Sequence, residues 1–279
     1  MLRVMTFNLR YREADDGANR WDRRKALAIA RIRAFDPDLL GIQECSAGPQ
    51  AAYLRRHLRD WTFQGVRTED ADWPVEMAPI LFRRGAFETV ATGHFWLSET
   101  PAVPSKSWDA DFARTATWAE LRHLETGRSF VFLNTHVDYQ PQAVKRSAQL
   151  LGKWIERIVR RVPIVVTGDF NADKRSPAYH RLTRSGLLRD VFGHGRVRKA
   201  DAGTFHGYGS VDPPPSIDWI LVSRHFKIVS ADVDRYVETT LFPSDHYPVT
   251  AVLRWKRSAV TSASRPGRRR GSAPRQIRD

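Results

Sequence analysis

The chain contains, at residues 162–171, the sequence Val162-Pro163-Ile164-Val165-Val166-Thr167-Gly168-Asp169-Phe170-Asn171. Residues 163–167 are β-branched and apolar on both faces, a pattern that is typical of a short buried β-strand. Asp169 and Asn171 follow at the end of this strand, and the two-residue period of an extended chain places both on one side. A carboxylate and a carboxamide in this position can orient a water, a metal ion or a phosphate, or can cap a turn.

Five further apolar runs meet polar, reactive residues at one end. Three runs are followed by them: residues 3–7 by Asn8, residues 39–43 by Glu44, and residues 130–133 by Asn134-Thr135-His136. Two runs are preceded by them: residues 219–222 by Asp218, and residues 247–253 by Ser244-Asp245-His246. If the last two runs are antiparallel to the others, all these side chains meet at one edge of a sheet. The pattern therefore predicts an active site at that edge.

Length and composition indicate a globular protein that can bury a sizeable core, in one large domain or in two. The chain has 279 residues, of which 42% are hydrophobic and 11% aromatic, and its formal net charge is +14. Residues 258–279 are rich in Ser, Ala, Arg, Pro and Gly, so we expect a disordered basic tail after a catalytic domain at residues 1–257. The run Arg268-Arg269-Arg270 would contact nucleic acid or anionic lipid by charge, or serve only as a solubilising end.

The expected compartment is the cytoplasm. No apolar run approaches the roughly 20 residues that span a membrane, and a strand predicted at the start of the chain leaves no room for a signal peptide. The lone Cys45 excludes an internal disulfide and fits a reducing environment. Nothing in the sequence indicates an obligate protein partner.

Helical and extended segments alternate along the chain. Helical periodicity predicts helices at residues 21–35, 50–58 and 142–161, and a short helix that begins at Ser176-Pro177 and stops near Gly186. Further strands are expected at 80–82, 87–91, 115–123 and 129–133, with long loops at 93–113 and 192–215, whereas residues 60–79 are not assigned. The expected fold is an α/β (α+β) four-layer sandwich, in which two mixed sheets pack face to face between helices.

The collected polar groups point to a metal ion. Four carboxylates at short range repel one another, and protons, basic side chains or a divalent cation would neutralise them. An oxygen-rich set with few histidines and no thiolate suits a hard ion, Mg²⁺ or Mn²⁺, and such an ion with amides and imidazoles suits phosphoryl chemistry. The set comprises Glu44, Asp169, Asp218, Asp245, Asn8, Asn134, Asn171, His136 and His246.

Six of these stretches, in order, resemble the endonuclease/exonuclease/phosphatase superfamily with its deoxyribonuclease-I-like fold. They are Thr6-Phe7-Asn8, Gly41-Ile42-Gln43-Glu44, Asn134-Thr135-His136, Gly168-Asp169-Phe170-Asn171, Ile217-Asp218 and Ser244-Asp245-His246. The stretches Asn8-Leu9-Arg10-Tyr11 with Asp16-Gly17, and Phe95-Trp96-Leu97-Ser98, resemble a bacterial branch of undefined substrate. The resemblance covers residues 3–254.

The resemblance implies a role for each matching residue. Glu44 is implied as the principal metal ligand, with Asn8 and Asp245 beside the metal. Asp169 and Asn171 would orient the attacking water and the phosphate, and Asp218 with His246 would form a His–Asp pair. His136 would contact phosphate or protonate the leaving group, while Arg114 and Asn134 would contact substrate. Which group acts as the base is left open.

Three functions are compatible with this site. We expect a Mg²⁺- or Mn²⁺-dependent phosphodiesterase that acts on nucleic acid, a nucleotide or a small phosphorylated metabolite. The basic charge and the aromatic residues Trp73, Trp96 and Trp108, if exposed, favour nucleic acid. A phosphomonoesterase of the same fold and a non-catalytic nucleic-acid-binding protein are the alternatives.

Overall fold

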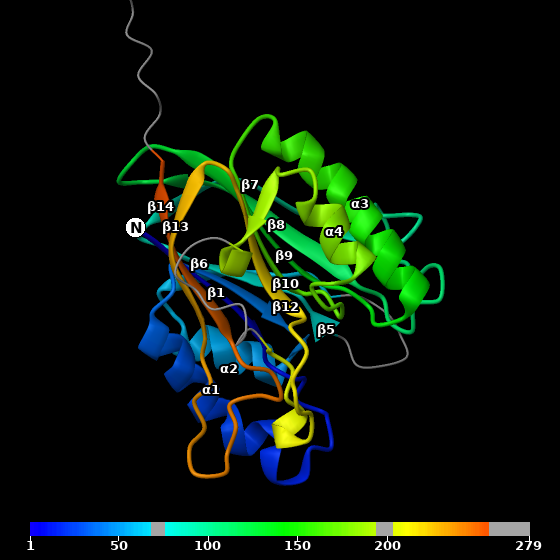
Figure 1. Ribbon diagram of the computed structural model, residues 1–279. Helices are drawn as coiled ribbons and strands as arrows, with labels where there is room; N and C mark the ends of the chain where they lie inside the picture. Colours follow the sequence, from blue (N-terminus) through cyan, green and yellow to red (C-terminus); the bar gives the residue numbers. More distant parts are fainter. Residues whose placement is uncertain (68–75, 194–202, 257–279) are drawn as a thin grey trace, which may run out of the picture.

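The protein folds into two six-stranded sheets packed face to face between helices, as seen in a computed structural model that describes residues 1–67, 76–193 and 203–256 (Figure 1). The first sheet has the strand order β13-β14-β1-β2-β6-β4 and the second has the order β11-β12-β10-β9-β8-β7. Both sheets mix parallel and antiparallel neighbours, which confirms the expected α/β sandwich.

The bounds of the elements follow from the backbone. The first sheet contains β1 (Leu2–Asn8), β2 (Leu39–Gln43), β4 (Trp61–Gln64), β6 (Ile80–Arg83), β13 (Phe226–Val233) and β14 (Val249–Trp255). The second contains β7 (Phe87–Trp96), β8 (Thr115–His123), β9 (Ser129–His136), β10 (Ile164–Asp169), β11 (Leu188–Asp190) and β12 (Asp218–Ser223). A small ladder joins β3 (Cys45–Ser46) to β5 (Glu76–Met77). The helices are α1 (Trp21–Phe35), α2 (Pro49–His57), α3 (Pro141–Val159) and α4 (Pro177–Thr183), with 3₁₀ turns at Gly17–Asn19, Val191–Gly193 and Gly207–Gly209.

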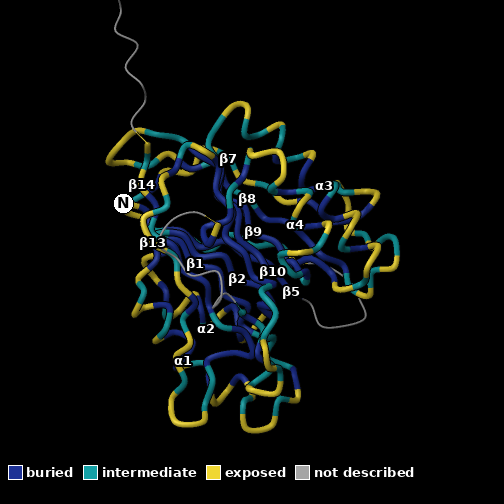
Figure 2. The backbone as a smooth tube through the Cα atoms, viewed as in Figure 1, coloured by how far each residue is buried: buried dark blue, intermediate teal, exposed yellow. Residues whose placement is uncertain are grey.

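Three hydrophobic clusters fill the spaces between four layers. Side chains alternate across each strand, so that Val4 of β1 enters the cluster between the sheets while Met5 enters the cluster under α1 and α2. In β10, Val165 likewise faces the other sheet and Val166 faces α3 and α4. Figure 2 shows the resulting dark-blue buried strands enclosed by exposed helix faces and loops. Burial on both faces explains why these strands are apolar throughout.

Several local predictions are confirmed. The four helices lie where the periodicity places them, and β1 and β2 are parallel, as a helical crossover requires. Ser176 caps α4 by accepting a hydrogen bond from the backbone N–H of Tyr179 (3.2 Å), and Gly186 has φ +72° just beyond the end of the helix.

Other local predictions are wrong or incomplete. β7 continues to Trp96 instead of ending near residue 91, so the predicted loop at 93–113 begins within a strand. The unassigned residues 60–79 contain β4 and β5, and β11 and β13 were not anticipated. β7 and β13 are edge strands with exposed side chains and a register shift, so they lack the apolar pattern of buried strands. The predicted tail at 258–279 lies outside the described residues, as does part of the loop at 192–215.

Candidate active site

The ends of strands from both sheets meet at one edge and carry the polar residues there. In the second sheet, Asp169 at the end of β10 pairs with His136 of the parallel β9 and with Asp218 of the antiparallel β12. In the first sheet, Asn8 ends β1, and Glu44 follows β2 directly. The expected antiparallel arrangement of the strands after Asp218 and His246 is thus confirmed.

Three of these residues converge on one point between the sheets. Glu44, Asp169 and His246 each direct a ligand atom to this point, and these atoms lie within 4.8 Å of one another. Asn8 bridges the two carboxylates, because its Nδ2 donates to Glu44 Oε1 and to Asp169 Oδ2, both at 2.9 Å. The carboxamide oxygen of Asn8 accepts from the backbone N–H of Arg10 (2.9 Å). Asn8 therefore fixes the spacing of the two carboxylates.

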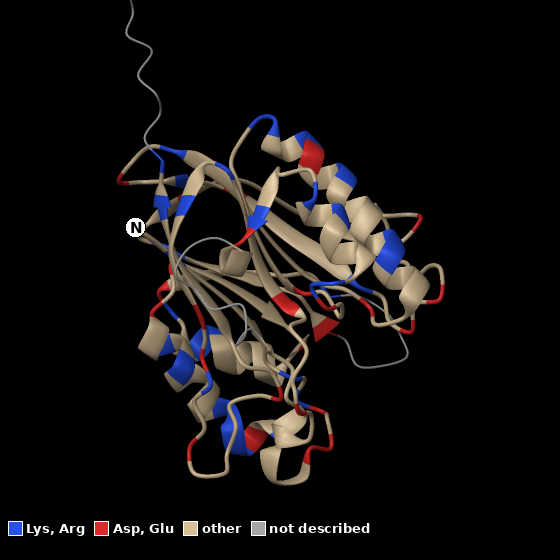
Figure 3. Cartoon of the chain, viewed as in Figure 1, with Lys and Arg blue, Asp and Glu red and all other residues tan. Residues whose placement is uncertain are grey.

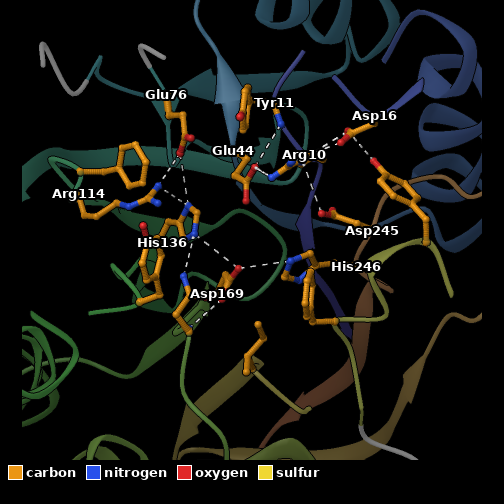
Figure 4. A pocket seen from close by; sticks show the side chains of 17 residues that line it. Arg10, Tyr11, Asp16, Glu44, Glu76, Arg114, His136, Asp169, Asp245 and His246 are labelled. Atoms are coloured by element: carbon orange, nitrogen blue, oxygen red, sulfur yellow. Dashed lines mark hydrogen bonds and ion pairs between the residues drawn. The ribbon is translucent and has the colours of Figure 1, made fainter. Parts of the chain in front are cut away.

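A cavity of about 550 Å³ opens above this point (Figure 4). Five carboxylates and two guanidinium groups line it, so it carries an excess of negative charge. Its lining comprises Arg10, Tyr11, Asp16, Glu44, Glu76, Phe112, Arg114, His136, Tyr139, Asp169, Asn171, Phe205, Gly207, Tyr208, Ile217, Asp245 and His246. Such an excess favours a bound cation, and a cavity of this size suits a small molecule.

His246 and Asp218 form the predicted pair. His246 Nδ1 lies 2.8 Å from Asp218 Oδ2, and both side chains are buried. Burial alone would lower the pKa of His246, but the charges of Asp218, Asp169 and Asp245 and the hydrogen bond to Asp218 raise it to about 10. The surrounding carboxylates thus favour the protonated form of the ring, whose Nε2 lies 3.8 Å from Asp169 Oδ2.

His136 is in the opposite electrostatic situation. Arg114 Nη1 donates to His136 Nδ1 (2.8 Å) and to Glu76 Oε2 (2.5 Å). Burial, followed by the charge of Arg114, lowers the pKa of His136 to about 4. Because a guanidinium can only donate, Nδ1 accepts and the single ring proton lies on Nε2, 3.6 Å from Asp169 Oδ2. His136 is thus a neutral hydrogen-bond donor.

The strand end at β10 holds Asp169 and Asn171 in fixed orientations. The backbone N–H of Asn171 donates to Asp169 Oδ1 (2.9 Å), and Asn171 Nδ2 donates to the carbonyl oxygen of Val137 (2.8 Å). Burial and the charge of Asp218 raise the pKa of Asp169. Asn171 has φ +46° and Glu44 has φ +52°, conformations that cost side-chain-bearing residues free energy and that cluster at functional sites.

Asp245 lies on the opposite side of the cavity beside Arg10. Its Oδ2 is 3.7 Å from Arg10 Nε, and Arg10 Nη1 is 3.8 Å from Glu44 Oε2. The loop that carries Arg10 is fixed by the fully buried Arg24. The Arg24 guanidinium donates only to backbone carbonyl oxygens, those of Leu9, Arg10, Asn19 and Pro243. Arg24 thereby ties the loop after β1 to the segment that precedes Asp245.

Three candidates do not line the cavity: Asn8 and Asp218 contact residues that do, whereas Asn134 does not. Asn134 is fully buried between the sheets, where its Oδ1 accepts from Gln43 (2.6 Å) and Thr167 (2.9 Å). Its Nδ2 donates to the carbonyl oxygens of Ile42 and Pro79. These bonds occupy the hydrogen-bonding capacity of the carboxamide, so the structure does not bring Asn134 to the substrate site. The side chain instead holds strand ends of the two sheets together.

Sequence reasoning missed several residues of the cavity. Glu76 lies in the segment that had no strand assignment, although it forms the ion pair that orients Arg114. Tyr208 comes from a long loop, and its signal was the flanking pair of glycines. Of the aromatic residues considered for base stacking, Trp96 is buried and Trp108 is half-buried, whereas Trp73 lies outside the described residues.

The fold and the polar site together define an α/β sandwich with a polar site where strand ends of its two sheets meet. Residues 5–246 match the Endonuclease/Exonuclease/phosphatase family, and the chain belongs to that family. Mouse Nocturnin is 25% identical over 88% of this chain, and an uncharacterized mimivirus protein is 26% identical over 56%. The chain spans only 63% and 61% of the lengths of these two relatives.

Solved structures agree with this assignment. A mannosyl-6-phosphatase from Bacteroides thetaiotaomicron has a TM-score of 0.82 and 32% identity, with coverage of 91% of this chain and 100% of that protein. The human Nocturnin catalytic domain with a bound sulfate has a TM-score of 0.70 and 21% identity, again over 91% of this chain and 93% of that domain. The members of the family and these neighbours include hydrolases of phosphoester bonds. Within the described residues, no helix is long and apolar enough to cross a membrane.

Proposed function

We propose that this protein is a divalent-metal-dependent hydrolase that releases phosphate from phosphate monoesters of small molecules. The observation that carries the proposal is the convergence of the Glu44 and Asp169 carboxylates beneath the cavity, beside the pair formed by His246 and Asp218. This arrangement combines a place for a cation with groups that can orient water and exchange a proton.

The donor chemistry fits a hard cation such as Mg²⁺ or Mn²⁺. The oxygens of Glu44 and Asp169 would hold it, with Asp245 nearby, because carboxylates are preferred over nitrogen by such ions. We assign Asn8 to positioning, since its NH₂ group faces both carboxylates. When bound, the cation would neutralise charge on the phosphoryl oxygens and on the leaving oxygen.

The protein groups around this point have complementary tasks. Asp169, fixed by Asn8 and Asn171, would hold the cation and help to orient the attacking water. His246 offers an N–H and a positive charge from one side, and His136 offers a neutral N–H from the other. These two donors would hold phosphoryl oxygens as negative charge develops on them.

Two observations favour a small monoester over the phosphodiester expected from sequence. The mannosyl-6-phosphatase is similar over its whole length, and the cavity has the volume of a small-molecule site. Figure 3 shows Lys and Arg spread over the helices and loops of this face and not gathered into one track, as binding along a nucleic-acid backbone would favour.

A substrate panel tests the proposal. Purified protein would be assayed with Mg²⁺ or Mn²⁺ on hexose 6-phosphates, nucleoside monophosphates, p-nitrophenyl phosphate, bis-p-nitrophenyl phosphate and single-stranded RNA, with phosphate release measured directly. We expect phosphate release from monoesters that EDTA abolishes. Preferential cleavage of the diester or of RNA would instead support the phosphodiesterase, and RNA binding without turnover would support the non-catalytic alternative.

A matched pair of variants ties the activity to this site. Glu44→Gln should lower kcat/KM at least about a hundredfold, because it removes a charge from the proposed cation site. Glu88→Gln makes the same chemical change at an exposed residue of β7 that is ion-paired with Arg122. It should leave activity unchanged. Equal activity of the two variants would refute the proposed site.

A further inference from the structure

One wall of the cavity is formed by three side chains from two distant loops, Arg10, Asp16 and Tyr208, here called the clasp. Arg10 reaches Asp16 with two atoms, Nε to Oδ2 at 3.4 Å and Nη2 to Oδ1 at 3.3 Å. The Tyr208 hydroxyl donates to Asp16 Oδ2 at 3.0 Å, across a separation of 192 residues. All three line the same cavity as Glu44 and His246. Figure 4 shows the Arg10 and Asp16 contacts on the Asp245 side, opposite Arg114 and His136.

The backbone places the clasp at a cost in conformational free energy. Gly207, Tyr208 and Gly209 have φ values of +53°, +57° and +89°, so three successive residues adopt the left-handed conformation. Arg10 also has a positive φ, +51°. This conformation is unfavourable for residues other than glycine, and strain of this kind is typical of functional positions. The Gly-Tyr-Gly turn thus presents the Tyr208 side chain toward Asp16.

The loop that carries Arg10 is held rigidly from behind. The Arg10 carbonyl oxygen accepts from Arg24 Nη2 (3.0 Å) and from Gln50 Nε2 (3.1 Å). The Arg10 side chain itself makes only long contacts, none shorter than 3.3 Å, and remains 31% exposed. A fixed backbone with a loosely engaged guanidinium leaves N–H groups available to a ligand in the cavity.

The clasp offers donors and acceptors side by side. The hydrogen bonds to Asp16 use three of the roughly four lone-pair positions of its carboxylate, so one acceptor position remains. The Tyr208 oxygen donates to Asp16 and can still accept, and Arg10 can donate. A ligand hydroxyl group can both donate and accept a hydrogen bond. Two neighbouring hydroxyl groups of a ligand could therefore bind the clasp together, one by donating to an acceptor and the other by accepting from Arg10. The side chains of Tyr11 and Phe205 add aromatic surface to the same cavity.

We infer that the clasp determines specificity, by hydrogen-bonding the hydroxyl groups of a polyhydroxylated leaving group such as a sugar or polyol. The inference rests on the proposed function, since it names the part of a phosphate monoester that this wall would recognise. Loss of one hydrogen bond to a charged group typically changes binding about tenfold to a hundredfold. A leaving group without hydroxyls would gain little from the clasp.

The test compares two substrates in the same metal buffer: a hexose 6-phosphate and p-nitrophenyl phosphate, whose leaving group has no hydroxyl group outside the ester. Tyr208→Phe removes only the hydroxyl and keeps the ring, and Asp16→Asn removes the charge. We expect the ratio of kcat/KM for the hexose phosphate to that for the aryl phosphate to fall tenfold or more in both, mainly through KM. The matched control is Tyr179→Phe, which deletes an equivalent hydroxyl bound to Asp190 at 3.0 Å outside the cavity. Its ratio should not change.

The outcomes separate the clasp from the proposed function. If both variants lose activity on the two substrates by the same factor, the clasp only holds loops together and the inference is refuted. A wild-type KM for hexose phosphates that is no lower than the KM for the aryl phosphate also overturns it, while leaving the proposed function intact. Absence of hydrolysis of every monoester overturns the proposed function itself. Melting temperatures of the variants show that the comparison is made between folded proteins.

Discussion

Replacing Asp218 with asparagine tests the charge state of His246, on which the electrostatics of the site depend. The difference between the ordinary histidine pKa of 6.5 and the value of about 10 corresponds to an interaction free energy on the order of 5 kcal/mol. Asp218, Asp169 and Asp245 share this interaction, but only Asp218 is hydrogen-bonded to the ring. Asp218 contributes most among the groups that raise this pKa, so we expect Asp218→Asn to destabilise the protein at pH 6, by less than about 5 kcal/mol.

The pH dependence gives the sign of the effect. A folded-state pKa above the unfolded value means that the folded protein binds more protons between pH 6.5 and about pH 10. The stabilisation is complete below pH 6.5 and is lost as the pH rises through 10. Urea unfolding in EDTA should therefore show that the wild type has a higher free energy of unfolding than Asp218→Asn. This difference should decrease by about 2 kcal/mol between pH 7 and pH 10.

The catalytic activity of Asp218→Asn should also become more sensitive to alkaline pH than that of the wild type. If protonated His246 assists the reaction, the alkaline limb of the kcat profile lies near pH 10 in the wild type and moves toward neutrality in Asp218→Asn. At pH values above the lowered pKa, rates would then fall about tenfold for each further pH unit, as the protonated fraction of His246 decreases. A constant stability difference from pH 7 to pH 10, together with an unmoved alkaline limb, would refute the assigned charge state.

Two further perturbations test the scaffold around the site. His206 is 3% exposed and has no partner for either ring nitrogen among the described residues, and burial lowers its pKa to about 4. The free energy of unfolding of the wild type should therefore fall as the pH falls from 6.5 to 4. In urea unfolding, the decrease between pH 7 and pH 5 should be smaller by about 2 kcal/mol in His206→Phe than in the wild type. Arg24→Met removes a donor from four backbone carbonyl oxygens, of which that of Arg10 keeps its bond to Gln50, and should cost about 2 to 4 kcal/mol in the same assay. Arg23→Met, an exposed neighbour on α1, should change stability by less than about 0.5 kcal/mol; equal effects of the two would contradict the role of Arg24.

Most of the fold was predictable because its central strands are buried on both faces. The run at 163–167 appears as β10, and the helical stripes at 21–35 and 142–161 appear as α1 and α3. Edge strands escaped prediction, since β13 alternates irregularly and exposes Lys227 and Val229. Their position is set by pairing with β14, which is a long-range interaction that a local pattern does not contain.

The site, too, was predictable where it follows from a local pattern and not where it depends on long-range contacts. Strand ends could be predicted to converge, because strand direction follows from the connections, and His136, Asp169 and His246 do lie together. Side-chain direction at a strand end is less predictable, since Asn134 is only two residues from His136 and points between the sheets. Tyr208 depends on three left-handed residues in a row, which the glycines permit and the sequence alone does not require.

The arrangement of the two histidines follows from which partner each one has. Both rings are buried, so desolvation opposes a positive charge on each. Asp218 overcomes this at His246, whereas Arg114 reinforces it at His136. Asp169 therefore lies between one charged and one neutral N–H donor, with distances of 3.8 and 3.6 Å to the two Nε2 atoms. A phosphoryl group bound here would meet fixed donors on both sides, while only one of the histidines could transfer a proton near neutral pH.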